Sequence, residues 1–466
     1  MTKKALAPVP FSCLDPAFSC RGALKGSGLL SQIVTWFFIF SLTGKASIIN
    51  ASQSLTINQL THIAIENNND LKAARYNIAV AQARLVQAGL WPNPSLNLNN
   101  TDDQFFSKEG EYTRSAGFTQ NFPISGRIGR QKNVARVDIA IAMTEIKEAK
   151  RKLKGAVADN YYAILITDYR LKQLKNLLSI NKKLVQVTEN RFHAAEVSEL
   201  DTNSASLEYQ RIFQEKQILE SLRISQIAQL NQLLGRDATS PLVLDKSLPK
   251  QGQLTISVAD AQALALKQRP DMQILQLSLN RAQATQQLAR AERWADWTVG
   301  VAFQQSKIFV EGGDPQKPDR ALSVGLAVPF PLFNANKGKI MEAGAVGTQT
   351  IGKMQALKLT IQTEVASNYA QLKALERALE QSRQKTVKLT FRNVKLARDA
   401  YKNGQLSLLE VLQIQRQQND LQVAYLNMLE KYLQALVKFC TALGNGGHTS
   451  LCSYLTDKRD LHDFTK

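Results

Sequence analysis

Two acidic residues at equivalent positions in the chain, Asp201 and Glu410, are the main candidates for functional side chains. Each closely follows a short stretch of small or helix-disfavouring residues that interrupts a long helical pattern. Repeated around a symmetry axis, such carboxylates would favour cations and form an electrostatic gate. An acid in the first turn of a helix is also stabilised by the helix dipole alone. Both interpretations stay open at this point.

Enzymatic chemistry has little support. A hydrolase or transferase needs acid, base or nucleophilic groups that converge in a pocket, and the chain has only four histidines, with His193 inside one of the interruptions. Neither CxxC nor HExxH spacing occurs, and no nucleotide-binding loop is present. We therefore expect a protein that is not an enzyme and that has no metal site and no cofactor.

The chain is strongly basic, with 58 Lys and Arg residues against 39 acidic ones and a net charge of +19. An excess of this size is compatible with nucleic-acid binding, but no zinc-finger, RRM or KH signature accompanies it. The charges are instead scattered along helical faces, which indicates solvated helix surface. We expect no nucleic-acid partner.

The N-terminus differs in character from the rest of the chain. Basic residues precede an apolar run over residues 29–42, and the small residues Gly44 and Ala46 follow it. This order is typical of a secretory signal peptide, here residues 1–46. The run is shorter than the roughly 20 residues of a transmembrane helix. A retained membrane anchor remains the alternative, because the basic region is long.

The positions of the cysteines are compatible with export, but they do not show whether a disulfide forms. Cys13 and Cys20 precede the apolar run, and Cys440 and Cys452 would remain after cleavage. One disulfide in an oxidising compartment and two free thiols are both open.

The mature chain consists of two copies of one pattern. Val157-Ala158-Asp159-Asn160-Tyr161 corresponds to Val365-Ala366-Ser367-Asn368-Tyr369, and Leu234-Gly235 corresponds to Leu443-Gly444. A repeat of roughly 190 residues is too long for a solenoid unit, so it indicates a duplicated half-fold. We expect a first repeat, a linker, a second repeat and a C-terminal tail over residues 47–240, 241–253, 254–445 and 446–466.

Very long helices dominate each repeat. No proline occurs between Pro123 and Pro241 or after Pro331, and proline is the strongest helix breaker. Residues 132–191 alone would span about 90 Å as a helix, so these helices must pack on one another as a coiled coil or a helical barrel. Residues 192–201 and 401–410 interrupt them, which indicates tight turns between antiparallel helices.

A β-hairpin is expected between the helices of each repeat. In the second copy, Trp297 to Phe303 and Leu322 to Phe330 alternate apolar with small or polar residues, which predicts two strands with one apolar face. The first copy has a weaker pattern over Ser95 to Thr101 and Tyr112 to Phe122, for which an irregular loop is the alternative. The two hairpins would occupy about residues 93–123 and 296–331.

These strands have the length of transmembrane β-strands. In a bilayer every strand edge must be paired, and four strands are too few to close a barrel. Several chains must therefore share one barrel, with the helices continuing from it as a tube. A secreted protein of this kind is a channel.

The same residues carry a family resemblance that covers about residues 55–444. The chain resembles the TolC family of outer-membrane efflux proteins, and more closely its heavy-metal and multidrug branch. The motifs lie where helices meet strands, and they are Trp91-Pro92-Asn93-Pro94, Phe122-Pro123-Ile124-Ser125-Gly126-Arg127, and Pro329-Phe330-Pro331-Leu332-Phe333-Asn334 with Gly338.

This resemblance implies a mixed α and β membrane protein. It implies a homotrimer with a twelve-stranded β-barrel, four strands per chain, in the lipid of the cell outer membrane. A long α-helical barrel would continue into the periplasm and taper there. Family members dock onto a periplasmic adaptor protein and an inner-membrane RND-type pump, so the chain itself would be a passive duct.

The resemblance also gives roles to the two interruptions, whose turns would face the adaptor. The family pattern of an aromatic residue followed three positions later by glycine is kept at Tyr401 and Gly404, whereas Phe192 is followed by Ala195. Alanine tolerates a left-handed conformation poorly, so the first turn could differ. We expect adaptor contacts, or alternatively turns without a partner, at Ala194, Ala195, Glu196, Asn403, Gly404 and Gln405.

Asp201 and Glu410 would then form six carboxylates around a threefold axis at the narrow end. In the family an acid at the Glu410 position contributes to the pore constriction, while Gln413 occupies a place where some relatives have a second acid. Tyr401 would help to close the end, or would be an aromatic residue of the core. The sequence leaves open the exported substrate, a type I protein secretion duct with the same fold, and a periplasmic coiled-coil scaffold without a pore.

Overall fold

The computed structural model describes residues 54–103, 110–246, 248–249, 256–308, 312–313, 317–382, 387–444 and 458–459. All of them belong to the unit that extends from Asn50 to Lys466. The predicted signal peptide lies outside the described residues, as do Cys13, Cys20 and Cys452. Cys440 is disulfide-bonded, so the alternative of a free thiol at this position was wrong.

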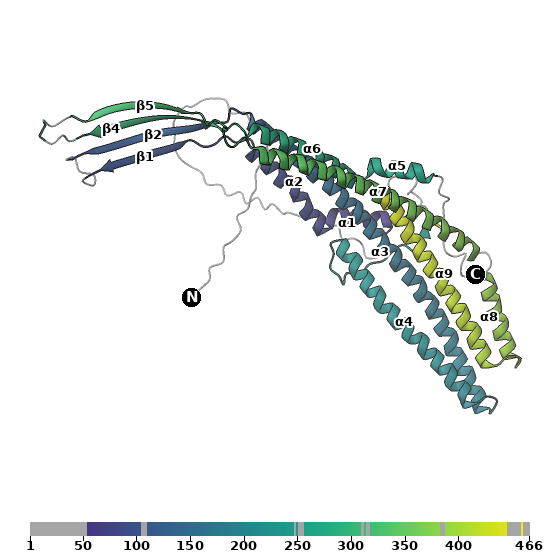
Figure 1. The fold of residues 1–466 in the computed structure, drawn as a ribbon. Coiled ribbons are helices and arrows are strands. Elements are labelled where there is room, and N and C mark those ends of the chain that lie inside the picture. Colours follow the sequence, from purple (N-terminus) through teal and green to yellow (C-terminus); the bar gives the residue numbers. More distant parts are fainter. Residues whose placement is uncertain are drawn as a thin grey trace, which may run out of the picture. The chain divides into compact units, whose positions relative to one another are not determined.

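The two halves of the chain contain the same order of elements (Figure 1). The first half consists of α1 (Ile57–Asn67), α2 (Asn69–Gln87), β1 (Ser95–Asp102), β2 (Tyr112–Phe122), α3 (Arg127–His193) and α4 (Glu199–Leu233). After β3 (Leu248–Pro249), the second half consists of α5 (Val258–Gln268), α6 (Pro270–Ala291), β4 (Trp297–Lys307), β5 (Asp319–Ala327), α7 (Lys337–Gln381), α8 (Val387–Lys402) and α9 (Leu408–Ala442). The short strand β6 (Lys458–Arg459) pairs with β3.

The predicted long helices are present, and α3 contains 67 residues. Both α3 and α7 begin after a residue with left-handed backbone, Gly126 and Asn336, which redirects the chain from strand to helix. In the second half, residues 383–386 between α7 and α8 lie outside the described residues. No described helix has both the length and the continuous apolar stretch needed to cross a bilayer.

The four long strands form one antiparallel sheet in the order β1-β2-β4-β5. The hairpin of the first half exists, so the alternative of an irregular loop was wrong. In the second half, β5 ends at Ala327, earlier than the Phe330 that the alternation predicted. Pro329 and Pro331 follow directly, and proline cannot donate the backbone hydrogen bond that a strand needs.

The sheet separates two kinds of side chain. Cross-strand pairing places Phe118 opposite both Leu96 and Val301, and Val301 opposite Val324, so these apolar residues share one face. The other face carries small and polar residues, including Asn97, Gly117, Ala302 and Ser323. Most large apolar residues of the first face are exposed, among them Leu96, Leu98, Phe118, Val301, Phe303, Leu322, Val324 and Leu326, whereas Val299 on the same face is half-buried.

The helix that the sequence predicted before each hairpin is in fact two helices. Between α1 and α2, Asn68 has an extended backbone and its side chain accepts a hydrogen bond from the Leu71 amide at 2.9 Å. Its amide group donates to the carbonyl of Leu233 at 3.0 Å. In the second half, Pro270 begins α6 directly after the break at Arg269.

The repeated glycines explain where these breaks lie. A Cβ atom on Gly235 would stand 2.3 Å from the carbonyl oxygen of Asn67, and one on Gly444 would stand 2.9 Å from the amide nitrogen of Arg269. The end of each last helix therefore packs directly against the break of its own repeat. Both glycines also have positive φ, 66° and 95°, as expected for residues that end a helix.

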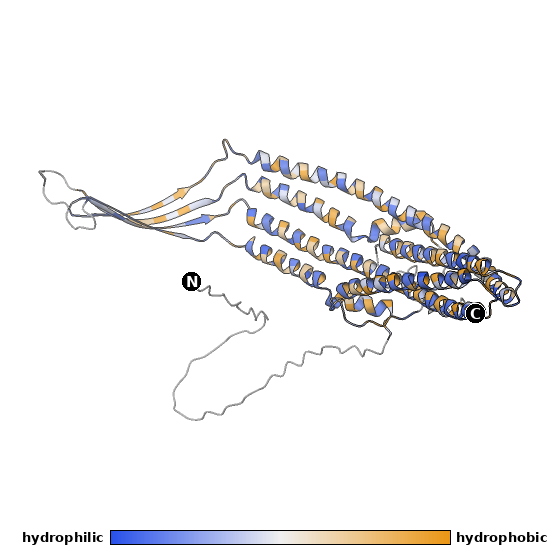
Figure 2. Ribbon diagram, turned by 90° about the horizontal axis from the view of Figure 1, so that it is seen from below, coloured by the Kyte–Doolittle hydropathy of each residue, from blue (hydrophilic) through white to orange (hydrophobic). Residues whose placement is uncertain are grey.

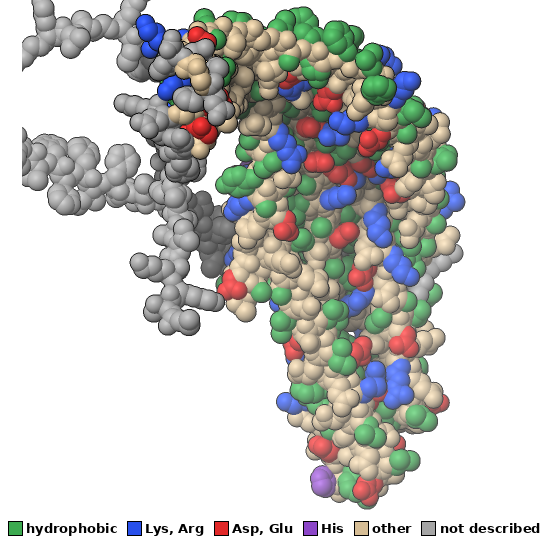
Figure 3. Space-filling view, turned by 60° about the vertical axis from the view of Figure 1, so that its left-hand side comes forward, with side chains coloured by type: hydrophobic (Ala, Val, Ile, Leu, Met, Phe, Trp, Pro, Cys, Tyr) green, Lys and Arg blue, Asp and Glu red, His purple; other side chains and the backbone are tan. Residues whose placement is uncertain are grey.

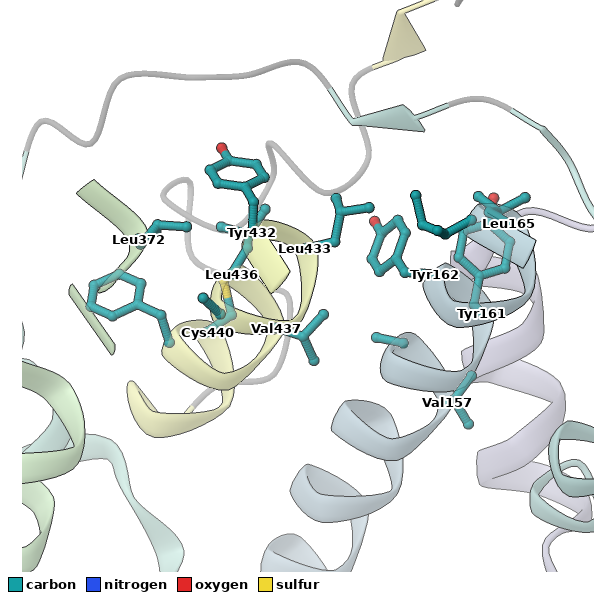
Figure 4. Packing of buried hydrophobic residues seen from close by; sticks show 14 of the residues in the cluster. Val157, Tyr161, Tyr162, Leu165, Leu372, Tyr432, Leu433, Leu436, Val437 and Cys440 are labelled. Carbon is teal, nitrogen blue, oxygen red and sulfur yellow. The ribbon is translucent and has the colours of Figure 1, made fainter. Parts of the chain in front are cut away.

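The main core joins α3 and α9 with parts of α1, α4, α5 and α7 (Figure 4). Along the helices, apolar and polar residues alternate rather than forming one apolar segment (Figure 2). Equivalent tyrosines hold the chain on either side of β3 to this core: Tyr161 donates to the carbonyl of Asp245 at 2.8 Å, and Tyr369 donates to the carbonyl of Ile256 at 3.2 Å.

Candidate functional site

The first predicted turn joins α3 to α4, and it exposes Ala194, Ala195 and Glu196. The Ala195 amide donates to the carbonyl of Phe192 at 2.9 Å, and the Glu196 amide donates to that of Arg191 at 2.8 Å. These bonds require a left-handed residue at the end of the helix, and Ala195 has φ of 58°. The expectation that the first turn could differ was therefore wrong, because Ala195 adopts the left-handed conformation that glycine normally provides.

The second turn joins α8 to α9 and has the same geometry. It exposes Asn403, Gly404 and Gln405. The amide of Gly404, whose φ is 71°, donates to the carbonyl of Tyr401 at 3.1 Å, and the Gln405 amide donates to that of Ala400 at 2.8 Å. The six residues predicted as adaptor contacts thus form two matching exposed turns.

The two predicted acids begin the helices that follow these turns. The Asp201 amide donates to the hydroxyl of Ser198 at 3.2 Å, and the Asp201 carboxylate accepts from the same hydroxyl at 2.9 Å. Glu410 and Ser407 repeat the arrangement at 3.3 and 2.8 Å. Hydrogen bonds from the Ser407 amide and hydroxyl lower the pKa of Glu410. Each carboxylate is therefore fixed at a helix N-terminus by a capping box, and these hydrogen bonds favour the charged form of Glu410.

Tyr401 lies inside the molecule rather than at its surface. Its side chain is buried in a tip cluster that consists of Ala205, Tyr401, Leu408, Val411 and Leu412. The guanidinium of Arg191 lies 5.3 Å from the centre of its ring and also pairs with Glu196 at 3.0 Å. Because Arg191 belongs to α3 and Tyr401 to α8, this contact brings the two turns together.

Behind the turns lies a charge cluster that the sequence did not predict, in which Glu208 is buried and its two arginine partners are about half exposed. Glu208 of α4 pairs with Arg211 of the same helix and with Arg416 of α9, both at 2.8 Å. Burial alone would raise the pKa of Glu208, but hydrogen bonds from the two arginines lower it. The spacing of Glu208 and Arg211 suggests a pair on one helix face, whereas nothing in the sequence connects either residue to Arg416.

A groove of about 1690 Å³ lies between α3, α4, α8, α9 and residues 242–246. Its lining mixes amides with charged groups, among them Gln173, which donates to Gln422, and Arg223, which pairs with Asp168. Positive and negative side chains are interspersed over the helical surface (Figure 3). Among the described residues, no group of histidine, cysteine and acidic side chains could hold a metal ion.

A sheet with one apolar face, joined directly to long helical hairpins, defines an outer-membrane export channel. The model of the outer membrane efflux protein family matches residues 60–236 and 262–445, and the chain belongs to this family. It is thus the outer-membrane exit duct of a tripartite efflux system, located in the outer membrane and extending into the periplasm.

Individual relatives agree with this assignment. The cobalt-zinc-cadmium resistance protein CzcC of Cupriavidus metallidurans is 22% identical over 84% of this chain and 91% of its own length. The pyoverdine export outer membrane protein OpmQ of Pseudomonas putida is 26% identical over 85% of this chain and 87% of its own. The crystal structure of the CmeC outer membrane channel of Campylobacter jejuni has the same fold, with a TM-score of 0.67 and 16% identity over 84% and 86% of the two chains. OpmQ is thus an export protein of the outer membrane, and CmeC is an outer membrane channel.

Proposed function

We propose that three copies of the chain form one channel, in which a twelve-stranded barrel continues into a helical barrel. The arrangement of free edges supports this assembly. Within the described residues, β1 and β5 are the outer strands of the sheet, and the helices next to it pack in the order α2-α3-α6-α7. Because α2 leads into β1 and β5 leads into α7, sheet and helices are open at the same two edges.

The open helices carry apolar side chains that a neighbouring copy would cover. Tyr76 on α2 is 73% exposed and Met341 on α7 is 74% exposed. Val80 on α2 and Leu359 on α7 are also exposed, although less so. Contact between α7 of one copy and α2 of the next would bury them, while β5 of one copy would pair with β1 of the next. Closure removes every strand edge, as a bilayer requires.

The apolar face of the sheet would then meet lipid, and its small and polar face would line the channel. Such alternation is the normal pattern of transmembrane barrels. Exposed aromatic residues stand at all four connections between strands and helices, where Trp91, Phe122, Trp294 and Phe330 are found. Aromatic side chains prefer the interface between membrane and water, which places this level at the periplasmic surface of the outer membrane.

The exposed turns are suited to an end-on partner. We assign Ala194, Ala195, Glu196, Asn403, Gly404 and Gln405 to contact with a periplasmic adaptor, which would connect the duct to an inner-membrane RND-type pump. Just behind them, Asp201 and Glu410 would form the carboxylate ring of the constriction. Tyr401 would support it from within the tip cluster.

Two kinds of cargo are consistent with the relatives. CzcC is named for resistance to cobalt, zinc and cadmium, and OpmQ is named for pyoverdine export. We propose metal ions or small molecules as cargo. A scaffold without a pore is disfavoured by the apolar face of the sheet.

The test is to measure the mass of the purified protein in detergent and its conductance in planar bilayers. We expect a trimer that conducts weakly, and a conductance several-fold larger after Asp201→Ala and Glu410→Ala together, because shortening the side chains of the ring widens the constriction. Asp237→Ala, which lies beyond the end of α4, is the control and should leave conductance unchanged. A monomer, or a protein without conductance even in the double variant, would contradict the proposal.

A further inference from the structure

We propose that Glu208 is a positioning residue that holds the beginnings of α4 and α9 at a fixed spacing, and thereby fixes the spacing of Asp201 and Glu410. This inference rests on the proposed constriction at those two carboxylates. It assigns a role to a buried acid that lies outside the turns and outside the ring itself.

The geometry around Glu208 joins two helices through one carboxylate. Its side chain is 4% exposed. One oxygen, Oε2, accepts from Arg416 Nε at 3.0 Å and from Arg416 Nη2 at 2.8 Å. Oε1 accepts from Arg211 Nη2 at 2.8 Å, and Arg211 Nε also donates to Oε2 at 3.2 Å. Hydrogen bonds between ionised groups are short and directional, so Arg416 can occupy few positions relative to α4.

The cluster lies at the same depth in both helices. Glu208 follows Asp201 by seven residues, about 10 Å along α4, and Arg416 follows Glu410 by six residues, about 9 Å along α9. The cross-helix bond is thus about two turns behind each carboxylate. A bond at this distance restrains both helix N-termini, because an α-helix is stiff over two turns.

Apolar packing in the same region cannot supply this restraint alone. Ala205 of α4 packs in the tip cluster with Leu408, Val411 and Leu412 of α9. The hydrophobic effect is non-directional, and a side chain as small as alanine permits the helices to slide past one another. The planar guanidinium of Arg416 fixes the register that the apolar contacts leave free.

Arg416→Met and Arg211→Met provide a matched test. Each removes one positive charge and one partner of Glu208, but only the first breaks the bond between helices. The spacing is measured by electron spin resonance between labels on p-acetylphenylalanine placed at the exposed positions of Leu200 and Leu409, which avoids the native cysteines. Labelled chains are diluted with unlabelled ones. Conductance is recorded in parallel.

We expect Arg416→Met to broaden the distance distribution and to raise conductance about threefold, since a released helix N-terminus populates wider states. Arg211→Met should change neither the distance distribution nor the conductance. Arg416→Lys should move both part of the way back toward the wild-type values, because it restores one charged hydrogen bond. A broader distribution without any change in conductance would support the positioning role and overturn the proposed constriction. An unchanged distance distribution in Arg416→Met would overturn the role of Glu208, whatever the conductance.

Discussion

The acids at the turns show how one residue can serve the local fold and the proposed pore together. Glu410 accepts hydrogen bonds from Ser407 that lower its pKa, so it remains ionised under mildly acidic conditions. The sequence identified Asp201 and Glu410 as candidates and left two interpretations. The capping boxes confirm that both acids stabilise helix N-termini, and that role is compatible with a place in the constriction. The buried Glu208 could not be predicted, because its partner Arg416 is remote in sequence.

Asp159 on α3 gives a prediction at the level of one residue. Burial raises its pKa to about 6, and nearby Lys438 opposes the shift only in part. Between about pH 4 and 6 the folded state therefore binds more protons than the unfolded state, so the free energy of unfolding falls as pH rises through this range. Asp159 is partly exposed, so we expect Asp159→Asn to recover only about 1 kcal/mol at pH 8.

The measurement is the denaturation midpoint of the purified protein as a function of pH. The wild type should lose stability from pH 4 to pH 7 relative to Asp159→Asn, and the two should converge below pH 4. Asp138→Asn, on the same helix and at an ion pair with Arg281, is the control. A wild type that gains stability relative to Asp159→Asn over this range would contradict the assignment.

At the level of elements, periodicity and proline placement predicted the helices, the hairpins and both turns. The breaks at Asn68 and Arg269 were missed, although Pro270 offers a signal because proline favours the first position of a helix. The reason for the breaks is tertiary. Gly235 and Gly444 bring the end of a distant helix against the chain, and a pattern read along one helix contains no information about that contact.

The two turns allow a matched prediction about helix ends. Ala195 has the left-handed conformation that costs alanine about 1 kcal/mol. Ala195→Gly should therefore raise the free energy of unfolding by about 0.5 kcal/mol, after the greater freedom of glycine in the unfolded chain is allowed for. Gly404→Ala should lower it by a similar amount, about 0.5 kcal/mol, because a Cβ there meets no atom within 4 Å and only the backbone is strained.

Chemical denaturation of both variants measures these changes, with Ala194→Gly as the control for an exposed alanine whose φ is negative. Equal effects of Ala194→Gly and Ala195→Gly would show that the left-handed conformation is not the cause.

At the scale of the whole chain, the sheet unites the two repeats. The central pair β2 and β4 comes from different halves and is matched from Tyr112 with Lys307 to Phe122 with Trp297. At its base, Arg127 of the first half and Asp296 of the second form a two-bond ion pair at 2.8 and 2.5 Å. The repeats are therefore joined within one sheet, and β1 and β5 are its outer strands among the described residues.

The two faces of that sheet allow the last prediction. Ser323 and Val324 are neighbours on β5 and belong to opposite faces. If the apolar face meets lipid, Val324→Lys places a charge in the bilayer at a cost of about 2–4 kcal/mol, and the protein should fail to assemble in lipid vesicles. Ser323→Lys faces the channel, so it should assemble and shift ion selectivity toward anions. Assembly is measured by the fraction resistant to external protease and selectivity by the reversal potential. Equal assembly of both variants would exclude lipid contact at this face.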